Sequence, residues 1–252
     1  MEELLDIIHE DAELLVINKP AGLVCHPTKD GPTSSLIGRV RLHLGGGSRP
    51  HLVNRLDRET SGVTFVAQND TVARELRRLW ESREVEKEYL AIVRGHVLED
   101  HGMVEVPLGK DEKSRVAIKD CVRADGLPSQ TEFFVQRRFS RRVDGAEKAA
   151  SAFSLLRVRP RTGRKHQIRI HLAHVGHPVV GDKIYGGDEN LYLSLVEGRL
   201  DEEQKRRLLL PYHALHARAV RFNWRGQELN FSCEPEKWFT EFYTADLAIG
   251  AG

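Results

Sequence analysis

Short runs of alternating or β-rich residues recur along the whole chain and constrain its fold more than any other feature. Successive side chains of a strand point to opposite faces, so such runs are typical of half-buried strands. The predicted strands are Glu13–Asn18, Val63–Ala67, Glu88–Arg94, Arg115–Lys119, Thr131–Phe139, Phe153–Arg159 and Leu215–Asn223. In addition, Arg225-Gly226 lies between Phe222–Trp224 and Glu228–Phe231, a pattern that predicts a tight hairpin.

Helical patterns are fewer than strand patterns. The clearest has apolar residues at helical spacing after a capping residue, Asn69 or Asp70, and consists of Val72, Leu76, Leu79 and Trp80. A second helix is predicted from about Lys165 to Val175, with Ile168, Leu172 and Val175 on one face, and is ended by Gly176 and Pro178. Because no regular helices separate the strands, we expect an α+β fold with a mixed sheet rather than a doubly wound one.

Size and composition indicate a globular protein. The chain has 252 residues, of which 40% are hydrophobic and 30% charged, and this balance argues against a disordered or membrane protein. No Pro/Ser-rich linker divides it, so we expect a single domain over residues 1–252 with a core of about 11–232, possessing at most two lobes. Gly45–Ser48 and Arg141–Ala150 are interpreted as mobile loops.

The N-terminal segment and the cysteines bear on the compartment. The first thirteen residues are rich in acids and hold no Lys or Arg, which is the opposite of a secretory signal, and apolar runs such as Leu14–Ile17 are too short to span a membrane. We therefore expect a cytoplasmic protein. Cys25, Cys121 and Cys233 form no Cys-x-x-Cys pair, so they are interpreted as buried, reduced thiols rather than a disulfide or zinc framework.

Charge is segregated along the chain although the net charge is only +1. Between residues 157 and 171 there is no acid, and the basic residues there are Arg157, Arg159, Arg161, Arg164, Lys165 and Arg169. A basic stripe of this kind suits a polyanion such as RNA, because each cation that neutralises a phosphate releases a counterion. A solvated face without a partner is the alternative, and charge alone does not decide between them.

Two polar clusters lie in the N-terminal third. The first is Asn18–Leu23, a rigid turn after a strand, followed by His26-Pro27. The second is Asn54–Gly62, in which Asp57 stands between Arg55 and Arg58. Neighbouring cations keep a carboxylate ionised, and a poorly hydrated carboxylate can act as a nucleophile or base. An aspartate that caps a turn and pairs with surface arginines is the structural alternative.

Two further clusters follow. On the predicted strand at Lys87–Ala91, Tyr89 shares a face with Ala91 and Val93, which leaves room for a planar ligand. A core tyrosine with a satisfied hydroxyl is the alternative, and this cluster alone favours it. The segment Arg161–His171 places a glycine-bearing turn at the start of a helix in the most basic part of the chain. A helix start among arginines is a suitable phosphate site.

With these four clusters in this order, the sequence resembles the RluA-type pseudouridine synthases over roughly Asp11 to Phe222. The resemblance implies a mainly antiparallel bent sheet flanked by helices and loops, with a central active-site cleft. It also implies isomerisation of a specific, flipped-out uridine in structured ribosomal or transfer RNA. Asp57 would be the nucleophile, Tyr89 would pack on the target base, and Arg169 would form an ion pair with Asp57.

The resemblance also bears on RNA binding and partners. Arg55 would occupy the space left by the flipped nucleotide, and the other expected RNA contacts are Arg58, Arg161, Arg164, Lys165 and His166. Because the isomerisation oxidises nothing, no cofactor is expected. The family usually has histidine where this chain has Asn54, which affects the expected RNA contact more than the chemistry. We expect no S4-like module, no obligate protein partner and a monomer.

Other functions are possible for the same residues. His171, His174 and His177, with His166 and Asp182 nearby, raise a metal hypothesis, but their spacing drifts around a helix and continues beyond Gly176. Ser61 lacks the Gly-x-Ser-x-Gly elbow, and the triple glycine at 45–47 lacks the Lys-Ser/Thr of a P-loop. A catalytically silent RNA-binding module and a phosphohydrolase that uses Asp57 covalently remain as alternatives, the latter without an evident second acid for magnesium.

Overall fold

The structure, a computed structural model, describes residues 4–27, 31–45, 49–142 and 150–244. The chain divides into two compact units, and each is described by itself. The first unit is Met1–Glu88 with His216–Glu236, and the second is Tyr89–Leu215 with Lys237–Gly252. Most of the glycine-rich loop at 45–48 and residues 143–149 of the second expected loop lie outside the described residues.

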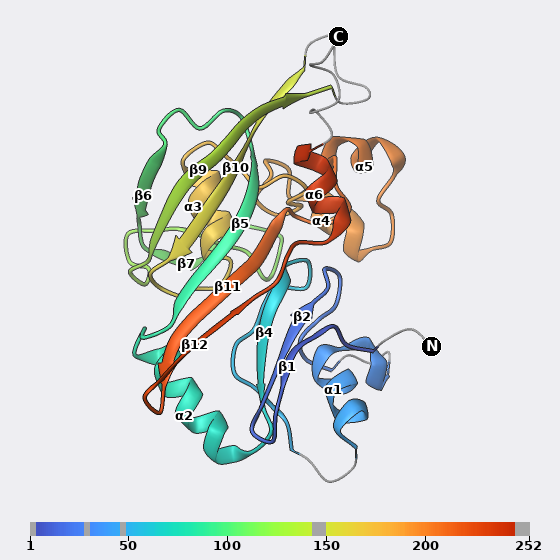
Figure 1. The fold of residues 1–252 in the computed structure, drawn as a ribbon. Coiled ribbons are helices and arrows are strands. Elements are labelled where there is room, and N and C mark those ends of the chain that lie inside the picture. The colour runs from blue at the N-terminus through green and yellow to red at the C-terminus, as the bar shows by residue number, and fades with distance from the viewer. Residues whose placement is uncertain (1–3, 28–30, 46–48, 143–149, 245–252) are drawn as a thin grey trace, which may run out of the picture. The chain divides into compact units, whose positions relative to one another are not determined.

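The first unit is built on a sheet in which neighbouring strands are antiparallel except for one pair (Figure 1). Its strands are β1 (Ile7–Glu10), β2 (Leu14–Lys19), β3 (His51–Leu52), β4 (Ser61–Ala67), β11 (Leu215–Trp224) and β12 (Gln227–Ser232). Strand β4 is buried along its whole length. It pairs antiparallel with β2 and β3, and parallel with β11 through His216 opposite Ser61 and Ala217 opposite Gly62.

The two longest helices of the first unit pack on side chains that alternate along β2. Leu14 and Val16 belong to a buried cluster with α2 (Asp70–Glu81), whereas Leu15 and Ile17 belong to a second cluster with α1 (Leu36–Leu44). Successive strand residues point to opposite faces, so each face of the sheet is covered by one helix. Helix α2 is the predicted one, and Asn69 caps it by accepting a hydrogen bond from the Val72 amide (3.0 Å).

The predicted hairpin joins β11 to β12 and turns at Arg225-Gly226. Both residues have positive φ, 51° and 80°, which a two-residue hairpin turn of type I′ requires at both central positions. Glycine adopts this region without strain, but arginine does not. The Arg225 guanidinium is held by Glu13 (2.9 Å) and Glu75 (2.9 Å), contacts that help to fix the strained residue.

The second unit contains four antiparallel strands in the order β5-β10-β9-β6. They are β5 (Glu86–Arg94), β6 (His101–Glu105), β9 (Gln130–Arg141) and β10 (Ser151–Pro160), and a separate pair is formed by β7 (Leu108–Lys110) and β8 (Asp120–Val122). The expectation of an α+β fold with a mixed, mainly antiparallel sheet is confirmed. The register of β9 shifts by one residue opposite Leu155 and Leu156, which indicates a bulge.

The helices of the second unit are α3 (Gln167–His174), α4 (Asn190–Val196), α5 (Glu202–Leu208) and α6 (Lys237–Thr244). Of these, α3 and α6 contribute side chains to the buried cluster of the unit. Ile168 and Leu172 of α3 join this cluster. On α6, the Phe242 ring packs edge-on against Phe153, with centroids 5.1 Å apart. Ile168 and Leu172 of the predicted apolar face therefore position α3, whereas Val175, the third predicted member, lies beyond the helix and is 41% exposed. Helices α4, α5 and α6 had no clear sequence signal.

Two predicted elements differ in the structure. Arg115–Lys119 is a turn, closed by the Lys119 amide on the Val116 carbonyl (2.9 Å), and the strand begins only at Asp120. Alternation there buries only Val116, while Ile118 is 43% exposed, so the pattern did not reflect a packed face. The predicted second helix begins at Gln167, because His166 has a left-handed backbone (φ 55°).

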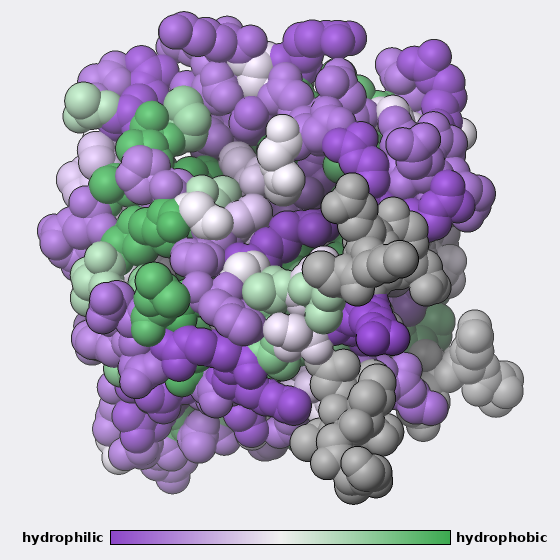
Figure 2. Space-filling model, turned by 90° about the horizontal axis from the view of Figure 1, so that it is seen from above, coloured by the Kyte–Doolittle hydropathy of each residue, from purple (hydrophilic) through white to green (hydrophobic). Residues whose placement is uncertain are grey.

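Charged and polar side chains cover most of the face shown in Figure 2, and hydrophobic residues gather there only in small groups. None of the helices in the described ranges combines the length and apolar character needed to cross a bilayer. The three cysteines are free thiols, but only Cys25 is fully buried, while Cys121 and Cys233 are half-buried. Burial raises the pKa of all three, to about 12 for Cys233.

Candidate active site

Asp57 lies in the loop between β3 and β4, where the backbone on both sides of it is fixed by the first polar cluster. The Leu56 carbonyl accepts a hydrogen bond from the Cys25 thiol (3.4 Å). The Arg58 carbonyl accepts one from the Gly22 amide (2.9 Å), and the Arg58 Nε donates to the Gly22 carbonyl (3.1 Å). The Asp57 side chain itself is half-buried. The first two sequence clusters therefore form one assembly that presents the Asp57 carboxylate.

Lys19 lies beneath this loop and is completely buried. Its ammonium donates to the carbonyls of Pro20 (2.8 Å), Leu23 (2.9 Å) and Arg58 (3.2 Å). Burial lowers the pKa of Lys19 from 10.5 to about 8, although nearby acidic groups that include Asp57 oppose this shift. At neutral pH the ammonium stays largely charged, so it ties the loop down and places a positive charge near Asp57.

Asn54, where the family usually has histidine, has a structural role. Its Oδ1 accepts from the Phe65 amide (2.8 Å), and its Nδ2 donates to the Val63 carbonyl (3.3 Å). Both partners belong to β4, so the side chain fastens the start of the Asp57 loop to the buried strand. The sequence raised a possible change in RNA contact at this position, whereas the structure assigns the amide to the backbone of β4.

The other end of the loop is held where β4 approaches β11. Gly62 has φ 114°, and a Cβ at this position would lie 2.2 Å from the Ala217 carbonyl oxygen. Ser61 Oγ is 2.9 Å from His216 Nδ1, and both residues are buried. Burial lowers the pKa of His216 to about 4, so the imidazole is neutral at physiological pH. Ser61 thus takes part in a structural contact, in agreement with its lack of a nucleophile elbow.

Tyr89 lies in β5 opposite Val158 of β10 and is half-buried. Its ring packs against the buried cluster of the second unit. The two neighbours on the same strand face, Ala91 and Val93, are completely buried, so they belong to the core and do not form a slot for a planar ligand. The predicted role of Tyr89 on a base stays a prediction, and only its partial exposure supports it.

Arg169 and Asp182 form a buried ion pair in the second unit. Arg169 Nε donates to Asp182 Oδ2 (2.7 Å) and Nη2 to Oδ1 (2.8 Å), and the side chains are only 5% and 0% exposed. The same Oδ1 accepts from the amides of Ile184 (2.9 Å) and Tyr185 (3.0 Å). Burial raises the pKa of Asp182, but the Arg169 charge and these hydrogen bonds outweigh it and hold this pKa well below the usual range.

Asp182 was not among the predicted catalytic or RNA-binding residues. The available signal was its position in a segment with Gly181 and Gly186 downstream of the basic helix. The structure shows why glycine stands there: a Cβ at Gly181 would lie 2.3 Å from the Tyr212 carbonyl oxygen, and one at Gly186 would lie 2.3 Å from the Asp182 carbonyl oxygen. These close approaches shape the loop that carries the carboxylate to Arg169. The predicted pairing of Arg169 with Asp57, a residue of the other unit, stays a prediction.

Tyr185 connects this ion pair to the start of α3. Its ring lies beside the Arg169 guanidinium, 5.1 Å from the ring centroid. Its hydroxyl is 2.9 Å from His166 Nδ1 and accepts from the Asp120 amide (3.1 Å). Asp120 in turn pairs with Lys165 (2.8 Å). One aromatic side chain therefore joins the arginine, the left-handed His166 and the β8 strand.

A buried polar network fixes the turn before α3. Gln167 Oε1 accepts from the Thr162 hydroxyl (2.6 Å) and the Arg164 amide (3.0 Å), while its Nε2 donates to the Thr131 hydroxyl (2.9 Å). His171, one turn further, is 2.8 Å from the same Thr131 hydroxyl through Nδ1. Burial lowers the pKa of His171 to about 4, so the network is uncharged at neutral pH.

The residues predicted to contact RNA differ in whether their side chains already bond to other residues of the protein. Arg55 is exposed. Arg161 Nη2 pairs with Glu132 (2.5 Å), and Arg164 Nε donates to the Pro128 carbonyl (3.3 Å). Arg58, Lys165 and His166 take the partners given above. Because Arg161 and Lys165 are each about half exposed, 52% and 47%, their ion pairs can open to solvent or to a polyanion.

The histidines of the metal hypothesis take separate hydrogen-bond partners. His171 is placed by Thr131 and by Ser129 (3.0 Å), and His177 Nδ1 lies 3.0 Å from the Arg94 carbonyl oxygen. Within the described ranges, His, Cys, Asp and Glu side chains form no group of three that could hold a metal ion. Asp182, the acid of that hypothesis, is engaged by Arg169.

Comparison with known proteins places these features in a family. The sequence pattern of the family described as RNA pseudouridylate synthase matches residues 13–174. An uncharacterized RNA pseudouridine synthase of Aquifex aeolicus is 34% identical over 92% of this chain and 70% of its own length. The ribosomal large subunit pseudouridine synthase D of Xanthomonas campestris is 35% identical over 86% of this chain, which spans 61% of that relative.

Comparison with solved structures supports the same family. The human RNA pseudouridylate synthase domain containing 1 superposes with a TM-score of 0.69 at 28% identity, over 94% of this chain and 86% of that one. The human RNA pseudouridylate synthase domain containing 4 gives the same score and identity over 93% and 90%. The matched segment contains the Lys19, Asp57, Tyr89 and Arg169 positions. The chain therefore belongs to the RNA pseudouridylate synthase family.

Proposed function

We propose that this protein converts a specific uridine of structured RNA into pseudouridine, with Asp57 as the nucleophile. The observation that carries the proposal is the half-buried Asp57 carboxylate in a loop held by Lys19, Gly22 and Cys25. A nucleophile that attacks one carbon of a sugar or base needs such a fixed position, because small displacements reduce the rate strongly. Ribosomal RNA is the favoured substrate, supported by the name of the Xanthomonas relative, with transfer RNA as the alternative.

The reaction is an isomerisation. The bond from N1 to C1′ of the ribose breaks, the uracil turns, and a bond from C5 to C1′ forms, while the proton on C5 leaves and N1 gains one. Asp57 attacks either C1′ or C6 and is released in the last step, so atoms and electrons balance without an oxidant. An ionised carboxylate is required, and the nearby Lys19 charge favours ionisation.

Arg169 is proposed as the cation that pairs with Asp57 in the working enzyme. Asp182 holds Arg169 through the Nε and Nη2 atoms of the guanidinium. We propose Asp182 as the positioning residue for Arg169, since two hydrogen bonds fix both the place and the plane of the guanidinium. In this arrangement, the Asp182 carboxylate keeps the buried Arg169 guanidinium charged and fixes its orientation.

Tyr89 and Arg55 are proposed to handle the nucleotide. A uridine within a folded RNA must leave its stack before a half-buried carboxylate can reach it, at a cost of a few kcal/mol. Tyr89, at an open edge of the core, packs on the flipped base, and Arg55, exposed in the Asp57 loop, fills the vacated stack. Arg58, Arg161, Arg164, Lys165 and His166 contact the surrounding RNA.

Tritium release tests the proposal directly. Purified protein should release tritium to water from ribosomal RNA transcripts that carry [5-³H]uridine, without added nucleotide. Asp57→Asn should bind the same RNA within about twofold and release none, whereas Asp125→Asn, which removes an exposed carboxylate, should behave as wild type. Release by Asp57→Asn at an appreciable fraction of the wild-type rate would remove Asp57 from its role. Pseudouridine mapping in cells with and without the protein identifies the RNA.

A second pair of variants separates chemistry from binding. Arg169→Lys keeps a positive charge but loses the two-pronged contact with Asp182, so kcat should fall at least tenfold with a small change in RNA affinity. Lys165→Ala removes an exposed cation and should chiefly weaken RNA binding in a salt-dependent way. Equal effects of both variants on kcat would contradict the assignment of Arg169.

A further inference from the structure

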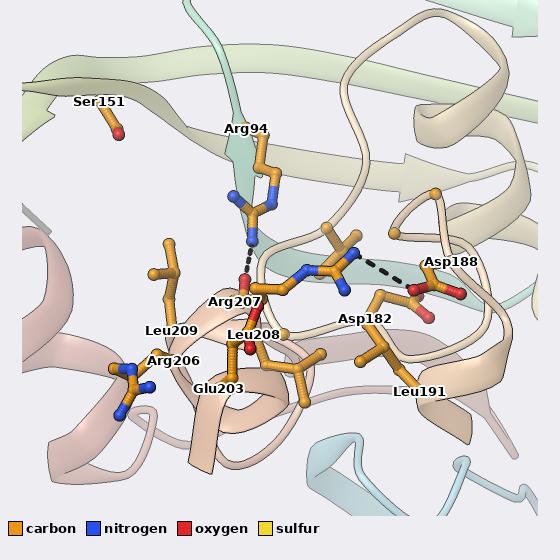
Figure 3. Close-up of a pocket in the computed structure, with 14 residues that line it drawn as sticks. Arg94, Ser151, Asp182, Asp188, Leu191, Glu203, Arg206, Arg207, Leu208 and Leu209 are labelled. Atoms are coloured by element: carbon orange, nitrogen blue, oxygen red, sulfur yellow. Dashed lines mark hydrogen bonds and ion pairs between the residues drawn. The ribbon is translucent and has the colours of Figure 1, made fainter. Parts of the chain in front are cut away.

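A cavity of about 590 Å³ in the second unit is lined by two arginines from distant parts of the chain (Figure 3). Arg94 comes from the end of β5 and Arg207 from the last turn of α5. Figure 3 shows the Arg207 side chain running from α5 past Arg94 towards Asp188, whereas Arg206 points away from both. The two guanidinium groups therefore share one end of the cavity, which Asp182, the partner of Arg169, also lines.

Arg94 is desolvated without a carboxylate to compensate. It is half-buried, and its Nη2 donates to the Arg207 carbonyl (2.6 Å), one of the last carbonyls of α5. Within the described residues, no Asp or Glu lies in ion-pair distance of it. Burial and, second, the like charge of Arg207 lower the pKa of Arg94. The carbonyl uses only one of the five N–H donors of a guanidinium.

Arg207 is only weakly held. Among the residues that the structure describes, its ion-pair partner is Asp188, with Nη2 3.2 Å from Oδ2 and side chains 54% and 30% exposed. Exposed pairs of this kind contribute little to stability, so an incoming anion can replace Asp188. The other acids at the cavity do not compete strongly, because Asp182 is engaged by Arg169 and Glu203 is exposed to solvent.

We propose that this cavity binds a phosphate group between the guanidinium groups of Arg94 and Arg207. Two guanidinium groups that repel each other across a cavity are stabilised by an anion placed between them, and planar guanidinium groups match the oxygens of a phosphate in pairs. The backbone of Gly186 and Gly187 and the Ser151 side chain border the same space, which leaves room for the rest of a phosphate-bearing molecule.

The favoured source of the phosphate is the backbone of the RNA, outside the target nucleotide. This part of the inference rests on the proposed function, whereas the phosphate site itself rests only on the geometry. A free phosphate monoester, such as a nucleotide, is the other source of the same chemistry. The two sources differ in whether loss of the site changes RNA binding.

Equilibrium dialysis with ³²P-labelled inorganic phosphate tests the site, using the 252-residue chain and three variants of one region. Arg207→Gln should weaken phosphate binding about tenfold, since it removes one charged donor pair. Asp188→Asn should strengthen it severalfold, because the carboxylate that competes for Arg207 becomes neutral. Lys205→Gln, which removes an exposed cation of α5 paired with Glu202, is the matched control and should bind as wild type.

The Asp188→Asn result is decisive, because misfolding cannot increase affinity. No binding of phosphate by the wild type, or equal binding by Arg207→Gln and Lys205→Gln, would overturn the site. For the RNA assignment, the salt dependence of RNA affinity is measured by filter binding with Asp57→Asn as background. Arg207→Gln should reduce the slope of log affinity against log salt concentration by the amount that corresponds to about one phosphate contact. If wild type binds inorganic phosphate but Arg207→Gln leaves the salt dependence of RNA affinity unchanged, the site binds a free phosphate monoester and the RNA assignment is overturned.

Discussion

Asp182 holds Arg169 through two hydrogen bonds of 2.7 and 2.8 Å while both side chains are removed from solvent. A buried pair of this kind is a poor source of stability compared with apolar packing, because both ions lose their hydration. It is, however, a strict orienting device: the guanidinium can satisfy both oxygens in only one plane. We therefore attribute the pair to positioning, and the loss of either member should affect catalysis more than RNA binding.

Asp182→Asn should lower kcat at least tenfold with RNA affinity within about twofold. The amide keeps the shape of the side chain but donates where the carboxylate accepted, so Arg169 loses its fixed plane. Turnover by tritium release and affinity by filter binding measure the two effects. The control is Asp125→Asn, which removes an exposed carboxylate outside the site and should leave both kcat and RNA affinity unchanged. A parallel fall in kcat and affinity would show a folding defect and contradict positioning.

The difference in stability between wild type and Asp182→Asn should depend on pH with a definite sign. The folded-state pKa of Asp182 lies below its ordinary value of 3.8, so its contribution to the free energy of unfolding is present above 3.8 and is lost as the pH falls from there through the lower folded-state pKa. We expect wild type to exceed Asp182→Asn by about 3 kcal/mol at pH 7, as for other broken buried pairs. The gap should narrow below about pH 5. Urea unfolding across this range checks it, and a constant gap would refute the linkage.

Lys19 gives a pH dependence of the same sign, but in an alkaline range. Its folded-state pKa is lowered from 10.5 to about 8, so between these values the unfolded chain binds more protons and stability due to this residue rises with pH. Lys19→Met should lose about 2–4 kcal/mol at pH 7, because three carbonyls lose their donor. The difference from wild type should widen from pH 8 to pH 10. Urea unfolding of both proteins at each pH measures it, and a narrowing difference would contradict the assigned pKa shift.

Gly62→Ala should be among the most destabilising single-methyl changes in this chain. The new Cβ would lie 2.2 Å from the Ala217 carbonyl oxygen at a φ of 114°, so the parallel contact of β4 with β11 would have to open. Gly31→Ala is the matched control, since Gly31 has φ 96° but nothing within 4 Å of a new Cβ. We expect a cost of about 1 kcal/mol at Gly31 and several times more at Gly62. Similar melting temperatures would show that only backbone strain matters.

Asn54→Ala should loosen the Asp57 loop. The variant leaves the Phe65 amide and the Val63 carbonyl without their side-chain partner, at a cost of about 1–3 kcal/mol. RNA affinity should change little, because the amide is used by β4. Asn190→Ala, which removes an exposed side-chain contact with Asp188, serves as control for thermal unfolding and filter binding. A large loss of RNA affinity with unchanged stability would show that Asn54 contacts RNA and would contradict its structural role.

Secondary-structure elements whose formation depends on residues close together in the sequence could be predicted. The α2 helix follows from its apolar spacing and the Asn69 cap, and the β11–β12 hairpin from Arg225-Gly226. The predicted strand at Arg115–Lys119 was wrong, because its alternation buries a single residue, Val116, and no partner strand faces the others in the described chain. Short helices such as α4 and α5 carried too few turns for a clear periodicity.

Within the candidate site, the sequence predicted chemical groups but not the contacts that hold them in place. Asp57, Tyr89 and Arg169 were predicted from motif order, and their catalytic roles stay predictions. The burial of Lys19 beneath the Asp57 loop and the pairing of Asp182 with Arg169 were visible only in the structure. The order of residues along the chain determined the strand and helix types, the basic stripe and the family resemblance, because these depend on local side-chain chemistry. Which ion is buried against which, and which carbonyl faces a glycine, was decided only by tertiary packing, since those contacts join segments far apart in the chain.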